Sequence, residues 1–344
     1  MKTIKSQGFV LTKYGEPETA FQLQDIDLQY SDEQILVKVS AFGLNYADVM
    51  ARLGKYQDAP PLPTTIGYEV VGNIEAVGAK IDSNLIGKRV LAFSQFGAYA
   101  RHAIIEKEAF VVLEEHVPDE DALALCTQYV TAYYMSMYQS VVRSHDIVLI
   151  HAAAGGVGLG LVQMCKNAGA TVLAKIGDDK KAATLKVLGV DHIINYNQVD
   201  YEKEVRRILG NKYLTYSFNP VGGLTFKKDM NLLGPLGKIV IFGGSSLTNG
   251  KYGILSQVNF VLQMGFPIPA FLMMQSKSIL GVNMLHVALE YPSILHTCME
   301  EVQKLYHQGA LKAFIGKVYD SNHLADAHHF LASGKSSGKL VVHW

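Results

Sequence analysis

Residues 147–177 read IVLIHAAAGGVGLGLVQMCKNAGATVLAKIG and carry the strongest structural signal of the chain. The apolar run 147–150 predicts a buried strand, a glycine-rich turn follows, and the pattern at 157–167 predicts a helix. A second apolar run at 171–176 predicts another strand. A strand, a glycine-rich turn, a helix and a strand in this order predict a βαβ unit whose turn binds the pyrophosphate of a dinucleotide.

The turn contributes five candidate phosphate-binding residues, Ala153, Gly155, Gly156, Val157 and Gly158. Gly155 would let the backbone approach the pyrophosphate, and Gly158 would let the helix pack close to the strand. The start of the helix would offer free N–H groups and the positive end of a dipole. Ala153 stands where GxGxxG has its first glycine, so the motif is a variant. An ordinary strand-to-helix turn without a ligand is the alternative.

Cations after the second strand favour NADPH over NADH. NAD-binding proteins place an acidic residue about 20 residues after the turn to bind the ribose 2′-OH, whereas a 2′-phosphate requires cations. Spacing alone nominates Asp178, but Asp178 and Asp179 suit the cap and first turn of the next helix. Lys175 and Lys181 are therefore the candidates for the 2′-phosphate, and a solvated lysine face is the alternative.

The pattern beyond the turn predicts an α/β protein with a doubly wound parallel sheet. Apolar runs such as 192–195 alternate with helical periods such as 201–209. This alternation is typical of βαβ units with helices on both faces of the sheet. We expect a dinucleotide-binding domain over residues 126–285.

The ends of the chain predict a second domain that is discontinuous. Residues 1–125 contain short β-like runs divided by Gly, Pro and Asn. Near the other end, a helical period at 292–307 and an apolar run at 339–343 have no βαβ partner. We expect residues 286–344 to return to the first domain and complete it.

Composition excludes several other classes of protein. The 344 residues include 31 basic and 31 acidic side chains, so no overall charge attracts nucleic acid or an anionic membrane. Cys126, Cys165 and Cys298 form no CxxC pair, and the N-terminus lacks the apolar run of a signal peptide. These features predict a cytoplasmic location. The apolar region 260–274 is shorter than a spanning helix requires, so no transmembrane segment is predicted.

Further motifs resemble the zinc-free quinone oxidoreductase branch of the medium-chain dehydrogenase/reductase superfamily. GLNYADVMARLGKY at 43–56 is similar to the branch's GxNxxDxxxRxGxY element, and residues 63–78 are similar to its PxxxGxExxGxVxxVG element. The AAxGGVG form of the turn is also usual in this branch. The insertion at 250–274 and the sequence GVNMLHV at 281–287 are most similar to the vesicle amine transport protein-like group.

The resemblance implies a GroES-like, mainly β catalytic domain and a Rossmann cofactor domain, with NADPH and substrate meeting in a cleft. It implies that Asn45 lies near the nicotinamide and the substrate, and that Asp48 and Tyr56 line the cleft. It also implies that Thr131 approaches the nicotinamide side of the cofactor.

The resemblance assigns further cofactor contacts in the Rossmann domain. Lys181 and Tyr196 fall where the branch holds the 2′-phosphate end, and the Phe242–Gly243 pair matches the branch after a strand. Two positions depart from the pattern. Met50 replaces a polar or aromatic residue, which leaves the substrate preference open, and Asn219 replaces an acidic residue.

The residues do not match a zinc alcohol dehydrogenase of the same superfamily. Such an enzyme would need a cysteine near position 45 and a GHE histidine, whereas this chain has Asn45 and Gly-Tyr-Glu at 67–69. Glu69 and Cys126 are too few ligands for a zinc site. The histidines show no metal-ligand spacing with cysteines, so no metal is predicted.

Together these observations predict an NADPH-dependent reductase that transfers hydride to quinones or α,β-unsaturated carbonyls without a metal. Tyr46, Tyr56 and Tyr133 are candidate proton donors. The alternative is a weakly active NADPH-binding sensor or partner-binding protein of the vesicle amine transport protein-like type.

The apolar region 260–274 allows two interpretations. It could form an adaptable wall for flat substrates, or a helix pair that contacts a second copy of the chain. The predicted strand 279–284 would lie at a sheet edge, where an unpaired strand invites pairing. A homodimer is therefore expected.

Overall fold

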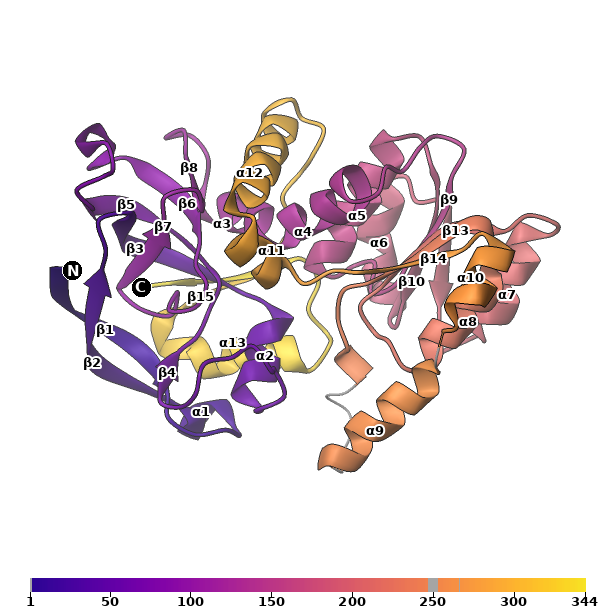
Figure 1. Ribbon diagram of the computed structural model, residues 1–344, viewed down its shortest axis with the longest axis horizontal. Helices are drawn as coiled ribbons and strands as arrows, with labels where there is room; N and C mark the ends of the chain where they lie inside the picture. Colours follow the sequence, from indigo (N-terminus) through magenta and orange to yellow (C-terminus); the bar gives the residue numbers. More distant parts are fainter. Residues whose placement is uncertain (1, 247–252, 266) are drawn as a thin grey trace. The chain divides into compact units, whose positions relative to one another are not determined.

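The computed structural model describes residues 2–246, 253–265 and 267–344. The chain forms two compact units (Figure 1). One unit combines Met1–Thr131 with Met284–Trp344, and the other is the continuous segment Ala132–Asn283.

The continuous unit contains a six-stranded sheet in which every pair of neighbours is parallel, in the order β11-β10-β9-β12-β13-β14. The chain moves outward from β9 in one direction and then returns to add β12 on its other side. The sheet therefore has its topological switch point between β9 and β12, where open α/β sheets bind ligands. The strands are β9 (Ile147–Ile150), β10 (Thr171–Ile176), β11 (His192–Asn195), β12 (Leu214–Asn219), β13 (Leu233–Ile241) and β14 (Ser278–Gly281).

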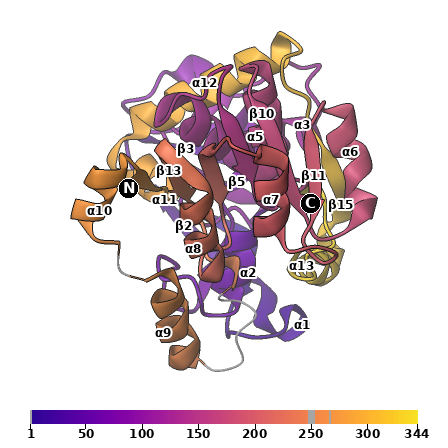
Figure 2. The ribbon, with the colours of Figure 1, turned by 90° about the vertical axis from the view of Figure 1, so that its right-hand side faces the viewer.

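Helices cover this sheet, and α7 and α8 lie side by side on one face (Figure 2). Buried residues recur every four positions in α7, at Tyr201, Val205 and Leu209, and pack against Leu149 of the sheet. Right-handed crossovers place α5 and α6 on the opposite face. The helices are α4 (Val130–Tyr133), which crosses the unit boundary, α5 (Gly156–Asn167), α6 (Ala182–Val187), α7 (Tyr201–Leu209), α8 (Leu224–Leu232), α9 (Gly253–Met264) and α10 (Pro269–Gln275), with a π-helix η3 (Tyr134–Tyr138) and a 3₁₀ turn η4 (Asp179–Lys181).

The discontinuous unit is built on β-strands from both ends of the chain. Its larger sheet has the order β15-β16-β3-β5-β6-β8, with β7 also paired to β3, and its smaller sheet has the order β2-β1-β4. The strands are β1 (Lys2–Leu11), β2 (Phe21–Tyr30), β3 (Gln34–Leu44), β4 (Thr64–Thr65), β5 (Glu69–Val77), β6 (Arg89–Phe93), β7 (His102–Glu106), β8 (Phe110–Val112), β15 (Ile315–Asp320) and β16 (Lys339–His343).

Strand β16 joins the sheet by pairing antiparallel to β3, with Leu340 opposite Leu44. This pairing brings the end of the chain to the start of α2, a helix that matters for the site. The helical elements of this unit are α1 (Pro17–Ala20), α2 (Tyr46–Arg52), α3 (Asp119–Ala124), α11 (Met284–Glu290), α12 (Pro292–His307) and α13 (Leu324–Ala332), with a π-helix η2 (Leu125–Tyr129) and 3₁₀ turns η1 (Ser83–Leu85) and η6 (Ser321–His323).

Two predicted strands have different limits in the structure. The strand expected over 279–284 ends at Gly281, because Met284 already begins α11. The apolar run at 238–242 also predicts a strand, and the structure places it in the second half of β13, which begins at Leu233 and ends at Ile241. Residues 233–237 include two glycines and a proline, which weaken a strand signal.

The apolar insertion at 250–274 forms α9 and α10 in its described part; residues 250–252 and 266 lie outside the described residues. The window Val258–Gln275 has a mean hydropathy of 1.2 and is long and apolar enough to cross a membrane by these criteria alone. However, α9 ends at Met264 and α10 begins only at Pro269. This window is therefore weak evidence for a membrane span.

Candidate functional site

The glycine-rich turn between β9 and α5 brings the helix unusually close to the preceding backbone. A Cβ atom on Gly158 would lie 2.4 Å from the carbonyl oxygen of Ala152, closer than real Cβ contacts permit. Ala152 itself has a φ of 49°, and its oxygen accepts a hydrogen bond from the Gly155 N–H at 2.8 Å. Ala153 is fully buried beneath the turn. Glycine at position 158 is therefore required for this geometry.

This turn presents backbone donors at the carboxyl edge of the sheet. Gly155 is the N-cap of α5, and Gly156, Val157 and Gly158 are its first three residues. Their N–H groups have no acceptor within the helix, and they lie at the positive end of its dipole. Gly156 and Val157 are partly exposed. These residues fit the pyrophosphate of a dinucleotide at the switch point.

The lysines predicted for the 2′-phosphate have different surroundings. Lys175, near the end of β10, is only 5% exposed, and its Nζ donates to Nδ1 of His151 at 3.2 Å. Burial lowers the pKa of Lys175 to about 8. Lys181, at the end of η4, is half-buried, and burial also lowers its pKa. Asp178 caps η4 by accepting from the Lys180 N–H, as the sequence predicts.

Tyr196 lies between the end of β10 and the surface. Its ring centroid is 4.9 Å from Nζ of Lys175, and the ring is about half exposed. A Cβ atom on Gly177 would lie 2.5 Å from the Tyr196 hydroxyl oxygen, so the tyrosine packs directly against this glycine. The structure thus brings Tyr196 and Lys175 together at the predicted 2′-phosphate end.

Phe242 and Gly243 directly follow β13, at the same edge of the sheet. The Phe242 N–H donates to the Asn219 carbonyl oxygen at 3.4 Å. A Cβ on Gly243 would lie 2.9 Å from the carbonyl oxygen of Pro220, so the loops after β12 and β13 are in close contact. This contact extends the candidate site to the end of β13.

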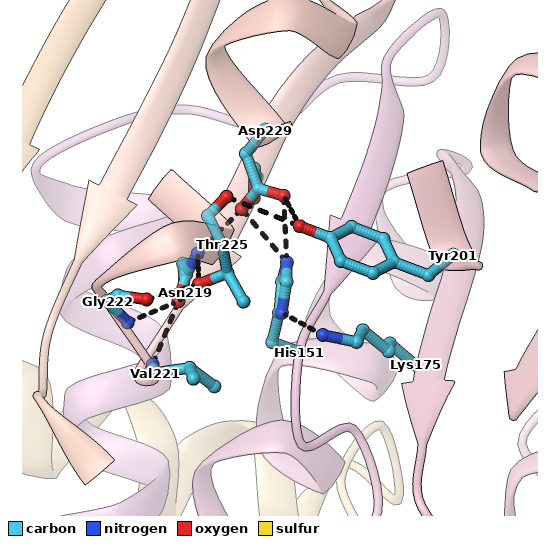
Figure 3. A network of polar contacts seen from close by, with 9 residues as sticks. His151, Lys175, Tyr201, Asn219, Val221, Gly222, Thr225 and Asp229 are labelled. Atoms are coloured by element: carbon cyan, nitrogen blue, oxygen red, sulfur yellow. Dashed lines mark hydrogen bonds and ion pairs between the residues drawn. The ribbon is translucent and has the colours of Figure 1, made fainter. Parts of the chain in front are cut away.

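Sequence reasoning missed a buried polar network beneath these loops (Figure 3). His151 and Asp229 have fully buried side chains, and Nε2 of His151 lies 2.9 Å from Oδ2 of Asp229. Burial raises the pKa of the Asp229 carboxyl. The interactions with His151, Ser217 and Asn219 lower this pKa by a larger amount, so the net shift is downward. Burial lowers the pKa of His151. The histidine directly after an apolar strand is the only sequence signal for this network.

In the discontinuous unit, the side chain of Asn45 is held on both sides. Its Nδ2 donates to Oε1 of Glu69 at 2.8 Å, and its Oδ1 accepts from Nζ of Lys339 at 3.2 Å. The Asn45 N–H donates to Oδ2 of Asp48 at 2.7 Å, which fixes the start of α2. Asn45, Asp48, Glu69 and Lys339 are all buried.

Glu69 connects this group to a second predicted residue, Thr131. It forms a buried ion pair with Lys339, and its Oε2 accepts from the Thr127 N–H at 2.7 Å. The Thr131 hydroxyl in turn donates to the Thr127 carbonyl oxygen at 2.5 Å. A continuous chain of hydrogen bonds therefore joins Asn45 to Thr131. Sequence reasoning did not assign a role to Lys339.

Tyr56 and Met50 lie near this group without joining the chain of hydrogen bonds. The Tyr56 ring is edge-on to Tyr68, with centroids 6.3 Å apart. Burial raises the pKa of Tyr56, so the phenol is neutral at ordinary pH. Met50 is half-buried in the second turn of α2. These residues could contact a ligand that reaches Asn45.

Among the described residues, two exposed groups of three side chains could each hold a metal ion. Within each group, the three potential ligand atoms lie within 4.8 Å of one another. Neither group contains a cysteine, Glu69 or any other residue of the motifs above. The groups are Glu114, His116 and His307, and Glu16, Glu18 and His329.

A parallel sheet with a dinucleotide-type turn, joined to a β-rich unit closed by both chain ends, defines a dehydrogenase or reductase of two-domain type. Residues 31–115 match the family described as alcohol dehydrogenase GroES-like domain, and residues 156–303 match that described as zinc-binding dehydrogenase. The chain belongs to the medium-chain dehydrogenase/reductase superfamily. The predicted fold class, GroES-like plus Rossmann, and the predicted family are confirmed.

Individual relatives agree with this assignment. The chain is 30% identical to the synaptic vesicle membrane protein VAT-1 homolog of Danio rerio, over 99% of this chain and 70% of that protein. It is 28% identical to the quinone oxidoreductase of Homo sapiens, over 96% and 95% of the two chains. The crystal structure of Escherichia coli quinone oxidoreductase complexed with NADPH superposes with a TM-score of 0.83, at 26% identity over 98% of this chain and 100% of that one. The chain is therefore an oxidoreductase of this superfamily with a dinucleotide-binding Rossmann domain.

The buried Asp48 makes a prediction about pH. Burial raises the pKa of Asp48 to about 7, although the Asn45 N–H and the Lys339 ammonium oppose the shift. Its Oδ1 has no hydrogen-bond partner among the described residues. Because the folded state holds this proton more tightly than the unfolded state, stability from Asp48 is present below pH 4 and is lost as the pH rises to 7.

We therefore expect Asp48→Asn to become more stable relative to the wild type as the pH rises from 4 to 7. The difference in the free energy of unfolding should grow by up to about 1.4 kcal/mol per pH unit. Urea unfolding at several pH values measures it. The control is Asp27→Asn, which changes an exposed carboxylate of β2. A difference that does not change with pH would show that Asp48 has an ordinary pKa.

Proposed function

We propose that the protein is an NADPH-dependent reductase that transfers hydride to quinones or α,β-unsaturated carbonyls without a metal. The observation that carries this proposal is the close-packed turn from Ala152 to Gly158 at the switch point of the parallel sheet. The NADPH complex of the Escherichia coli relative supports it. In this proposal Ala132–Asn283 binds the cofactor, and the discontinuous unit supplies the catalytic side chains.

The residues of the discontinuous unit suit reduction of an electrophilic acceptor. Bound NADPH would supply the hydride. Glu69 and Lys339 fix the orientation of the Asn45 amide, and Glu69 takes one of its two Nδ2 hydrogens, which leaves the second to bind an acceptor oxygen. A neutral phenol such as Tyr56 can donate a proton to the enolate or quinolate oxygen, and Tyr46 and Tyr133 remain alternatives.

The donor set around Asn45 does not suit a catalytic metal ion. Glu69 is the carboxylate that contacts the Asn45 side chain, but Lys339 places an ammonium on it and the Thr127 N–H donates to its other oxygen. A divalent cation at Glu69 would have to replace that ammonium. Burial raises the pKa of the neighbouring Cys126 well above its ordinary value, so its thiol is not a ready ligand.

We expect the purified protein to oxidise NADPH in the presence of an ortho-quinone, a para-quinone or an enone, with a turnover number on the order of 1 per second or higher. Loss of absorbance at 340 nm measures the reaction. Gly158→Ala is the matched control, because its Cβ would collide with Ala152 and distort the phosphate turn. This variant should lose turnover with every acceptor.

Two failures of this experiment have different meanings. If NADPH binds but no acceptor is reduced, the alternative proposal gains support, namely a weakly active NADPH-binding sensor or partner-binding protein. The exposed apolar side chains of α9 and α10, and the relative named as a synaptic vesicle membrane protein, favour that alternative. If neither NADPH nor NADH binds, both proposals are wrong.

We propose Lys181 as the cation that binds the 2′-phosphate, because it lies in η4 after β10 and is half-buried, whereas Lys175 is only 5% exposed. Lys181→Ala should weaken NADPH binding roughly 10- to 100-fold, the range for a hydrogen bond to a charged group, and change NADH binding little. Lys180→Ala, which removes the exposed neighbouring lysine, is the control. Fluorescence titration measures both dissociation constants. Equal losses for NADPH and NADH would exclude this role.

We also propose a homodimer formed through the edge strand β14 and the helices α9 and α10. Among the described residues, β13 is the one strand that pairs with β14, and Met273 and Met274 are 76% and 73% exposed. Met274→Asp should shift the protein from dimer to monomer in sedimentation velocity. Val187→Asp, at a site 79% exposed on α6, should leave the dimer intact. A wild-type monomer at micromolar concentration would contradict this proposal.

A further inference from the structure

The carboxylate of Asp229, on α8, is the centre of the buried network in Figure 3. Its Oδ2 accepts from the Ser217 hydroxyl at 2.7 Å and from Nδ2 of Asn219 at 2.6 Å. Its Oδ1 accepts from the Tyr201 hydroxyl at 2.9 Å. Nε2 of His151 is the remaining donor. A buried carboxylate with this many hydrogen-bond donors remains ionised. Packing of α8 alone would not require so many donors to one side chain.

One arm of the network leads to the loop between β12 and α8. The Oδ1 of Asn219 accepts from the backbone N–H groups of Val221 at 2.8 Å and Gly222 at 3.0 Å. Because Asp229 accepts from Nδ2 of the same amide, it orients the Asn219 side chain so that Oδ1 faces the loop. This loop follows β12, one of the two strands that flank the switch point.

The other arm leads to the phosphate turn and to β10. His151 is the first residue of the turn, and its Nδ1 accepts from Lys175 while its Nε2 donates to Asp229. The Lys175 ammonium also lies 4.0 Å from the centre of the Tyr201 ring. One carboxylate therefore fixes side chains from the ends of β9, β10 and β12. These strand ends form the edge where a dinucleotide would cross the sheet.

This arrangement explains the amide at position 219. Asn219 stands where the resembling family often has an acidic residue, and here a carboxylate reaches the same place from α8. Two carboxylates at 219 and 229 would repel each other at hydrogen-bond distance, whereas an amide and a carboxylate attract. The pair is complementary in either order, provided that one member is an amide.

We propose that Asp229 is a positioning residue of the dinucleotide site, which acts through Asn219 on the β12–α8 loop and through His151 on Lys175. This inference rests on the proposed dinucleotide binding and adds that the Asn219–Asp229 pair can be exchanged. The exchange distinguishes positioning from simple packing, because packing volume is nearly the same for Asp and Asn.

The experiment compares Asn219→Asp, Asp229→Asn and the double exchange by NADPH titration. Asn219→Asp should weaken binding about tenfold or more, because it places two carboxylates together. Asp229→Asn should weaken it similarly, because both arms lose their charged acceptor. In the double variant, Asn at 229 can donate to Asp at 219, which restores the Asn219 arm but not the charged acceptor of His151. The double variant should therefore bind NADPH more tightly than the product of the two single losses predicts, though still more weakly than the wild type. Asp191→Asn, at a partly exposed carboxylate paired with Lys166, is the control and should bind as the wild type.

If the losses of NADPH affinity in the single variants simply multiply in the double variant, positions 219 and 229 are not an exchangeable pair. If the folded single variants bind NADPH as tightly as the wild type, Asp229 has no positioning role. If a single exchange prevents folding, Ser217→Ala and Tyr201→Phe each remove one neutral donor to Asp229. They should still weaken NADPH binding a few-fold, and no change in either would also overturn the proposal. A wild-type protein that binds no dinucleotide would instead refute the proposed function. The interaction between positions 219 and 229 could then still be measured from the thermal stabilities of the two single variants and the double variant.

Discussion

The cofactor unit depends on one close approach of backbone to backbone, between Gly158 and Ala152. Only the absence of a side chain at 158 lets the start of α5 lie directly against the end of the turn. Because α5 begins so close to the end of β9, its first N–H groups lie at the carboxyl edge of the sheet. The buried pairs around His151 and Asp229 then fix the neighbouring strand ends relative to that edge.

The site in the discontinuous unit depends on a different contact, a buried charge pair between distant segments of the chain. Glu69 and Lys339 are both fully buried and lie 270 residues apart in sequence. A buried ion pair of this kind seldom adds net stability, because desolvation offsets the attraction. The pair orients the Asn45 amide, and the second oxygen of Glu69 accepts from the Thr127 N–H.

Local signals explain which parts of this structure follow from sequence. The sequence predicts α7 over the residues that form it from the helical period at 201–209, and the structure adds that Asp200 caps this helix. It misses β12, whose buried Ser217 and Asn219 are held by Asp229 and not by apolar character. The phosphate turn is predictable because it is contiguous. The burial of Lys175 and the partners of Asn45 are not, because they depend on strand pairings among distant segments.

The pairing of β16 with β3 has a consequence for the order in which the protein can be assembled. Lys339 follows Asn45 by 294 residues, and the whole cofactor unit lies between them. At ordinary rates of synthesis, roughly 15 to 60 s pass between the emergence of these two residues. During that interval the early strands lack their last neighbour and Glu69 lacks its partner Lys339, and the last residue of the cofactor unit, Asn283, is made before Lys339. The dinucleotide-type unit therefore has all of its residues before the hydrogen bonds around Asn45 can be completed.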